Sequence, residues 1–222
     1  FVKDESSRLG LKSFKVLGAS YAMKMELERN PQIRTFITAT DGNHGKAVAW
    51  MAKILNKNSI IYIPKRSSIC RINAIKEEGA QVVVVDGDYD LAVYKAKSKT
   101  SKLNTEAGKT ICSLVQDTAW NSYTQVPLDI MLGYTTQMNE ISSQLMGNKV
   151  DVVLLQSGVG TWAASVVSYI VSHWTYKPIF ISVEPVSSNC LFRSISKGKR
   201  VSFNSGDRTS MAGLDCGSVS TI

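Results

Sequence analysis

Short apolar runs alternate with helical patterns along most of the chain. The runs typical of strands cover residues 35–39, 59–63, 81–85, 110–115, 151–156 and 178–183. Between them, apolar side chains recur every three or four residues, which predicts helices over residues 13–29, 45–55, 68–78, 89–102, 130–145, 161–172 and 188–196. This alternation favours an α/β fold with parallel sheets and right-handed crossovers. The four consecutive valines of residues 82–85 are typical of a strand buried on both faces.

Composition narrows the class of protein. The chain has 222 residues, is 44% hydrophobic and carries a net charge of +8. Its basic residues are scattered, with one local run at residues 197–200 and no interleaved aromatic residues. This pattern disfavours nucleic acid and favours small anionic ligands, or no role for the charge. No apolar run approaches the roughly 18 residues of a membrane span, and the polar start shows no signal peptide, so we expect a cytoplasmic protein.

The four cysteines do not form a metal-binding pattern. None belongs to a C-x-x-C pair, and the chain has only two histidines, which disfavours a zinc site. We expect no metal and reduced thiols. Cys190 and Cys216 lie in polar, loop-like surroundings, which leaves a disulfide between these two residues open.

Two predicted strand-to-helix turns are candidates for chemistry. Residues 157–161 read Ser-Gly-Val-Gly-Thr, and glycines before a helix allow backbone N–H groups to bind a phosphate. The turn lacks the third glycine and the acidic residue of a dinucleotide fingerprint, and no Gly-Lys-Ser/Thr of a P-loop follows. Residues 41–45 read Asp-Gly-Asn-His-Gly, at the end of a strand where open α/β sheets bind ligands. The alternatives are a tightly packed turn for the first and a helix cap from Asp41 or Asn43 for the second.

Lys15 is the third candidate, in the first turn of the predicted helix 13–29. A lysine is usually a solvated surface charge, and the positive end of the helix dipole disfavours a cation there. The same field, together with burial, favours the uncharged amine. An uncharged amine is the form that Schiff-base chemistry with an aldehyde requires. His44 is a candidate base, but we favour a structural role near the start of its helix.

Together these motifs resemble the fold type II pyridoxal-phosphate enzymes, the group similar to tryptophan synthase β. Within this group the chain is most similar to the diaminopropionate ammonia-lyases. The resemblance covers nearly the whole chain and rests on residues 4–6, 14–18, 38–45, 49–50, 62–65, 115–120, 158–160, 183–185 and 211–214. The stretches around Asp41 and Asp117 are the most specific, since serine and threonine dehydratases usually have serine where this chain has Asp41.

The resemblance implies pyridoxal 5'-phosphate as the cofactor and assigns roles to individual residues. Lys15 would form the Schiff base with it, and Asn43 would hydrogen-bond the phenolic oxygen of its ring. Asp41 and Asp117 would act on the substrate as catalytic acid and base. The phosphate would be bound by Gly158, Val159, Gly160 and Thr161.

The resemblance also implies domains and activity. We expect a small α/β domain over residues 30–122 and a larger, discontinuous domain from residues 1–29 and 123–222, with the cofactor between them. The expected reaction is β-elimination of 2,3-diaminopropionate to pyruvate and ammonia, in amino-acid catabolism and by a homodimer. Relative to the family we expect the chain to lack an N-terminal, an internal and a C-terminal segment. The alternatives are a lyase similar to serine/threonine dehydratases, or an inactive fragment.

Overall fold

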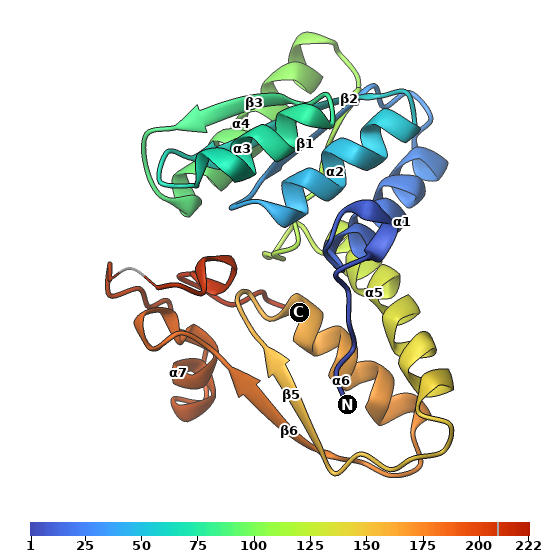
Figure 1. The fold of residues 1–222 in the computed structure, drawn as a ribbon. Coiled ribbons are helices and arrows are strands. Elements are labelled where there is room, and N and C mark those ends of the chain that lie inside the picture. The colour runs from blue at the N-terminus through green and yellow to red at the C-terminus, as the bar shows by residue number, and fades with distance from the viewer. Residues whose placement is uncertain (208) are drawn as a thin grey trace. The chain divides into compact units, whose positions relative to one another are not determined.

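The structure is a computed structural model that describes residues 1–207 and 209–222. The chain forms two compact units, Phe1–Gln116 and Asp117–Ile222. Figure 1 shows their elements along the chain. The α/β class with parallel sheets flanked by helices is confirmed. The predicted domain that joins residues 1–29 to residues 123–222 stays a prediction.

The first unit is built on a four-stranded parallel sheet. Its strand order is β3-β2-β1-β4, and Ile37 of β1 lies opposite Ile60 of β2 and Leu114 of β4. The strands are β1 (Thr35–Ala39), β2 (Asn58–Pro64), β3 (Gln81–Val85) and β4 (Cys112–Leu114). The helices are α1 (Lys15–Arg29), α2 (Asn43–Ile54), α3 (Ile69–Glu77) and α4 (Tyr89–Glu106).

The order of these strands explains how the unit's own helices cover its sheet. The chain moves in one direction from β1 through β2 to β3, then returns across the sheet to β4. Right-handed crossovers therefore place α2 and α3 on one face and α4 on the other, as Figure 1 shows. Phe36, Ile37, Ile61 and Ile63 are fully buried in the resulting core. The point of reversal lies between β1 and β4, where open α/β sheets place their ligands.

The prediction that residues 82–85 form a strand buried on both faces is wrong. The strand β3 exists with the expected bounds, but it is the edge strand of the sheet, and Val84 is 48% exposed. A run of valines favours a strand through its β-branched side chains. It does not decide how far the helix layers on the two faces extend over an edge strand.

The second unit is built on a two-stranded parallel sheet, β5 (Val152–Gln156) and β6 (Ile179–Val183). The helices are α5 (Gln125–Gln144), α6 (Thr161–His173) and α7 (Cys190–Ser196). Leu155 of β5 packs in a core with Met138 of α5 and with Val166 and Ile170 of α6. Among the described residues, no helix is long and apolar enough to cross a bilayer.

The expected loop-like surroundings of Cys190 are also wrong. Cys190 is the first residue of α7 and is fully buried. Its thiol lies 3.4 Å from the carbonyl oxygen of Cys216, and both cysteines are reduced thiols. Burial raises the pKa of the Cys190 thiol to about 11, and the nearby charge of Glu184 adds to the shift.

Candidate active site

The turn at residues 157–161 leads from the end of β5 to the start of α6. Gly160 has a φ of 94°, in the left-handed region that favours glycine. A Cβ atom at Gly158 would lie 3.1 Å from Sγ of Cys216 and 3.4 Å from the carbonyl oxygen of Gly213. The glycines therefore shape this turn at the start of α6, and a helix N-terminus of this kind attracts anions.

The hydroxyl group of Ser157 makes the turn suited to an anion. Ser157 is 1% exposed, and its Oγ atom has no hydrogen-bond partner among the described residues. This atom is also the nearest one, at 3.8 Å, to a Cβ atom built at Gly160. Buried hydroxyl groups are normally hydrogen-bonded. A phosphate at the turn would provide the missing acceptor, so these residues fit a phosphate-bearing cofactor.

Asp117 is connected to the same turn within the second unit. Its side chain is buried, and its backbone carbonyl accepts a 2.5 Å hydrogen bond from the hydroxyl group of Thr161. The structure thus brings together two residues that the sequence analysis assigned to different roles. Thr161 is buried as well, as the first residue of α6.

The turn at residues 41–45 is held by the side chain of Thr40 in the first unit. The hydroxyl oxygen of Thr40 accepts hydrogen bonds from the N–H groups of Gly42, at 2.9 Å, and Gly45, at 3.1 Å. A Cβ atom at Gly45 would lie only 2.3 Å from Cγ2 of Thr40, so this position requires glycine. The ring of His44 hydrogen-bonds the carbonyl oxygen of Val115 through Nε2 at 2.8 Å.

The alternative that Asp41 or Asn43 caps the helix is wrong. The N-cap residue of α2 is Gly42, and the described residues form no side-chain cap bond there. Thr40 satisfies the free N–H groups instead, which leaves the Asn43 side chain exposed at the start of α2. The carboxylate of Asp41 accepts a 3.4 Å hydrogen bond from the Ser67 hydroxyl.

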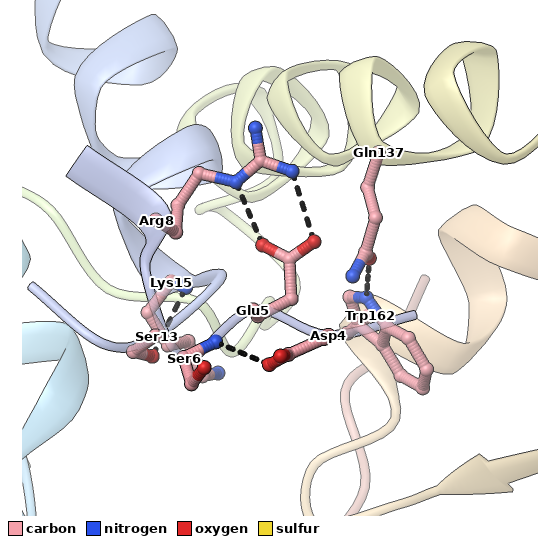
Figure 2. Close-up of polar contacts among 8 residues, drawn as sticks. All are labelled: Asp4, Glu5, Ser6, Arg8, Ser13, Lys15, Gln137 and Trp162. Carbon is pink, nitrogen blue, oxygen red and sulfur yellow. Dashed lines mark hydrogen bonds and ion pairs between the residues drawn. The ribbon is translucent and has the colours of Figure 1, made fainter. Parts of the chain in front are cut away.

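Lys15 is the first residue of α1, and Figure 2 shows its contact with Ser13. Its backbone N–H donates to Oγ of Ser13 at 3.3 Å, and its Nζ atom lies 5.6 Å from the centre of the Phe14 ring. The preceding segment is ordered by its own polar contacts. Arg8 binds the carboxylate of Glu5 through two hydrogen bonds of 2.8 and 2.9 Å. This bidentate pair fixes the chain just before α1.

Figure 2 also shows a contact within the second unit, where the indole N–H of Trp162 donates to Oε1 of Gln137 at 2.8 Å. This bond joins the first turn of α6 to α5. The helix that begins at the glycine turn is therefore fixed by a side-chain contact next to its first residue.

Gln116 is a residue whose role the sequence analysis missed. It is fully buried two residues after β4, and its Oε1 atom accepts hydrogen bonds from the Thr38 hydroxyl at 3.0 Å and the Ala39 N–H at 3.1 Å. Its Nε2 atom donates to the hydroxyl of Tyr89 at 2.6 Å. The stretch at residues 115–120 contained the signal, but a glutamine in a sequence does not reveal its partners. Ser157 was missed for the same reason.

The residues that the sequence analysis assigned to the site are divided between the two units. The first unit carries Lys15 at the start of α1, and Asp41 and Asn43 in one turn. The second unit carries Asp117 and the glycine turn, joined by the Thr161 hydrogen bond. The functional roles of these residues stay predictions.

Comparisons with known proteins show which proteins the chain is similar to. The chain is 39% identical to diaminopropionate ammonia-lyase of Escherichia coli K12 over 236 aligned positions, which cover 97% of the chain and 58% of the relative. It is 28% identical to a biosynthetic L-threonine dehydratase of Haemophilus influenzae, over 86% of the chain and 34% of that protein. The chain thus spans less than two thirds of the length of these relatives.

A solved structure leads to the same family. The chain superposes with a TM-score of 0.86 on Escherichia coli diaminopropionate ammonia lyase in complex with an aminoacrylate-PLP azomethine reaction intermediate. The match covers 98% of this chain and 57% of that one, at 39% identity. The family model for pyridoxal-phosphate dependent enzymes matches residues 1–222. The chain therefore belongs to the family of pyridoxal-phosphate dependent enzymes.

Proposed function

We propose that this chain carries catalytic parts of a pyridoxal-phosphate-dependent lyase that converts 2,3-diaminopropionate to pyruvate and ammonia by β-elimination. The observation that carries the proposal is the 39% identity to a diaminopropionate ammonia-lyase across 97% of the chain. The presence of Asp41 supports this substrate over a hydroxy amino acid, for which the related dehydratases usually have serine.

The glycine turn of the second unit would hold the cofactor's phosphate. The N–H groups at the start of α6 and the positive end of its dipole attract an anion. Gly158, Val159 and Gly160 would contribute backbone N–H groups, as would Thr161. The free Ser157 hydroxyl would add a side-chain donor.

The first unit would supply groups that bind the cofactor at its ring. The bound cofactor contributes an electron sink that stabilises negative charge at the α-carbon of the substrate. Lys15 would bind the cofactor covalently through its amine and would form this bond again after each turnover. Asn43, exposed at the start of α2, would donate to the ring oxygen.

Asp41 and Asp117 would handle the protons. A carboxylate that removes the α-proton must lie within hydrogen-bond reach of it, and a carboxylic acid must protonate the departing β-amino group. Asp41 is held in its turn by the Thr40 contacts and bonded by Ser67, while Asp117 is buried and held through its backbone. The position of each aspartate is thus set by contacts within its own unit.

A lyase similar to the serine/threonine dehydratases is the second candidate, and the 28% identity to a threonine dehydratase favours it. Turnover of L-serine or L-threonine in preference to diaminopropionate would establish it. We further propose a homodimer that acts in the cytoplasm in amino-acid catabolism. The resemblance to the lyases supports these points.

Lys15 provides the direct test. The protein is incubated with pyridoxal 5'-phosphate, reduced with borohydride and mapped by mass spectrometry, and pyruvate release from diaminopropionate is measured in parallel. We expect the label on Lys15, no label at this position in Lys15→Ala, and turnover that falls by more than about 10²-fold in that variant. The neighbouring Lys12→Ala serves as the control and should keep both properties.

Each outcome of this experiment decides between the alternatives. A label on another lysine contradicts the site. A label on Lys15 without pyruvate release supports an inactive fragment that still binds the cofactor. With L-threonine assayed alongside, release of 2-oxobutyrate from it without release of pyruvate from diaminopropionate supports the dehydratase.

A further inference from the structure

The hydroxyl group of Thr161 is already used inside the second unit. It donates to the carbonyl oxygen of Asp117 at 2.5 Å, and both residues are buried. A threonine hydroxyl has a single proton to donate. A phosphate oxygen is an acceptor and needs a donor, so this hydroxyl cannot serve the phosphate and the Asp117 carbonyl at once.

A second contact joins the same two segments through the end of the chain. The backbone N–H of Ser220 donates to the carbonyl oxygen of Val159 at 2.8 Å. The hydroxyl oxygen of Ser220 accepts a 2.9 Å hydrogen bond from the N–H of Ala119. Residues 117–119 are therefore tied to the glycine turn at two points, directly through Thr161 and indirectly through Ser220.

The free donor at this turn belongs to a different residue. Ser157 is buried, its hydroxyl lacks a hydrogen-bond partner among the described residues, and its Oγ atom lies beside Gly160. The two hydroxyl groups that flank the glycines thus differ in state: one is engaged with Asp117 and the other is available.

We propose that Thr161 is a positioning residue that couples phosphate binding at the glycine turn to the placement of Asp117, and that Ser157 is the side-chain donor to the phosphate. The proposal rests on the proposed function for the roles of the phosphate and of Asp117. When a phosphate orders the N–H groups of the turn, it also orders Thr161, the first residue of α6. Thr161 then holds the backbone from which the Asp117 carboxyl group extends.

The test separates the two hydroxyl groups with four variants. Thr161→Val keeps the shape and removes the hydroxyl, and Thr161→Ser restores it. Ser157→Ala removes the other hydroxyl. Ser165→Ala is the matched control, because Ser165 is also buried on α6 and donates to a backbone carbonyl, that of Met131 at 2.7 Å, away from Asp117.

Binding and turnover should respond to different variants. We expect Ser157→Ala to weaken pyridoxal 5'-phosphate binding by about 10-fold or more, the value of one hydrogen bond to a charged group. Thr161→Val should change this affinity by less than about 3-fold while lowering kcat on diaminopropionate by about 10- to 100-fold at unchanged KM. Thr161→Ser and Ser165→Ala should stay within about 3-fold of the original protein in both.

Hydrogen exchange gives a readout that does not need turnover, and its first measurement uses the original protein. Adding pyridoxal 5'-phosphate to the original protein should slow exchange of the amides at residues 117–119, and Thr161→Val should abolish this response. Unchanged exchange at residues 117–119 on cofactor binding overturns the coupling. So does a Thr161→Val variant that loses affinity like Ser157→Ala yet keeps its kcat.

The failure of this inference can be told apart from the failure of the proposed function. Slower exchange at residues 117–119 without any turnover of diaminopropionate overturns the function and keeps the coupling. Turnover without this exchange response overturns the coupling alone. A protein that does not bind the cofactor overturns both.

Discussion

The two units differ in how far helices cover the faces of their parallel sheets. In the first, helices cover both faces of the four-stranded sheet, and the central strands β1 and β2 are buried. In the second, one face of the β5–β6 sheet packs on α5 and α6. The other face carries five apolar side chains that are between 41% and 66% exposed: Val152, Leu154, Ile179, Ile181 and Val183.

The difference shows what covers the second face of a parallel sheet. In folded proteins such sheets are covered on both faces by crossover helices. The first unit has the reversal of direction between β3 and β4 that sends α4 to the second face. The second unit has a single crossover, through α6, so its sheet receives a helix layer on one face only. An apolar face of this kind favours association with another surface.

The largest effect is expected from comparing substitutions at two neighbouring residues of β5. Leu155 is 3% exposed in the core, whereas Leu154 is 65% exposed on the apolar face. Leu155→Lys would bury a charge and should lower the free energy of unfolding by more than about 4 kcal/mol. Leu154→Lys should cost less than about 0.5 kcal/mol and should reduce binding of a hydrophobic dye. Urea unfolding followed by tryptophan fluorescence checks both, and equal losses would contradict the one-sided sheet.

A smaller effect should show how much the buried Gln116 side chain stabilises the first unit. Gln116→Leu removes the acceptor for Thr38 and Ala39 from a fully buried site. We expect a loss of about 2 to 4 kcal/mol in the free energy of unfolding. Thr38→Val, which removes one of the two donors, is the matched control and should cost about 1 kcal/mol. A neutral Gln116→Leu would show that β1 and β4 do not depend on this side chain.

The smallest effect concerns the buried thiol of Cys190 in the second unit. Burial raises the pKa of Cys190 from 9.0 to about 11. Below pH 9 the thiol is protonated in both the folded and the unfolded protein, so it contributes no difference. Between about pH 9 and 11 only the unfolded protein loses the proton, so the free energy of unfolding should fall by about 2 to 3 kcal/mol at most.

The Cys190 effect can be isolated by substitution. Cys190→Ala should remove this part of the pH dependence and leave the rest of the profile unchanged. Alkylation gives an independent check, because Cys70 is exposed and should react with iodoacetamide at pH 8 well before Cys190. Similar rates for the two thiols would contradict the burial of α7 at its first residue.

The sequence by itself determined where most elements lie. Strands β1 and β3 have the predicted bounds, and both strand-to-helix turns lie where their glycines indicated. These features are local, because the period of apolar side chains and the permissive backbone of glycine act over a few residues. The sequence also sufficed to recognise the family, through short motifs spread over the chain.

Only the tertiary structure decided which side chains meet. The exposed edge at β3, the burial of Cys190 and the partners of Gln116 depend on segments far apart in the chain. The same holds for the two hydroxyl groups at the glycine turn, which look alike in the sequence. Thr161 is engaged because the backbone carbonyl of Asp117 lies beside it, whereas the Ser157 hydroxyl has no such partner among the described residues. A hydrogen bond needs a partner at a definite distance and direction, and local patterns do not contain that information.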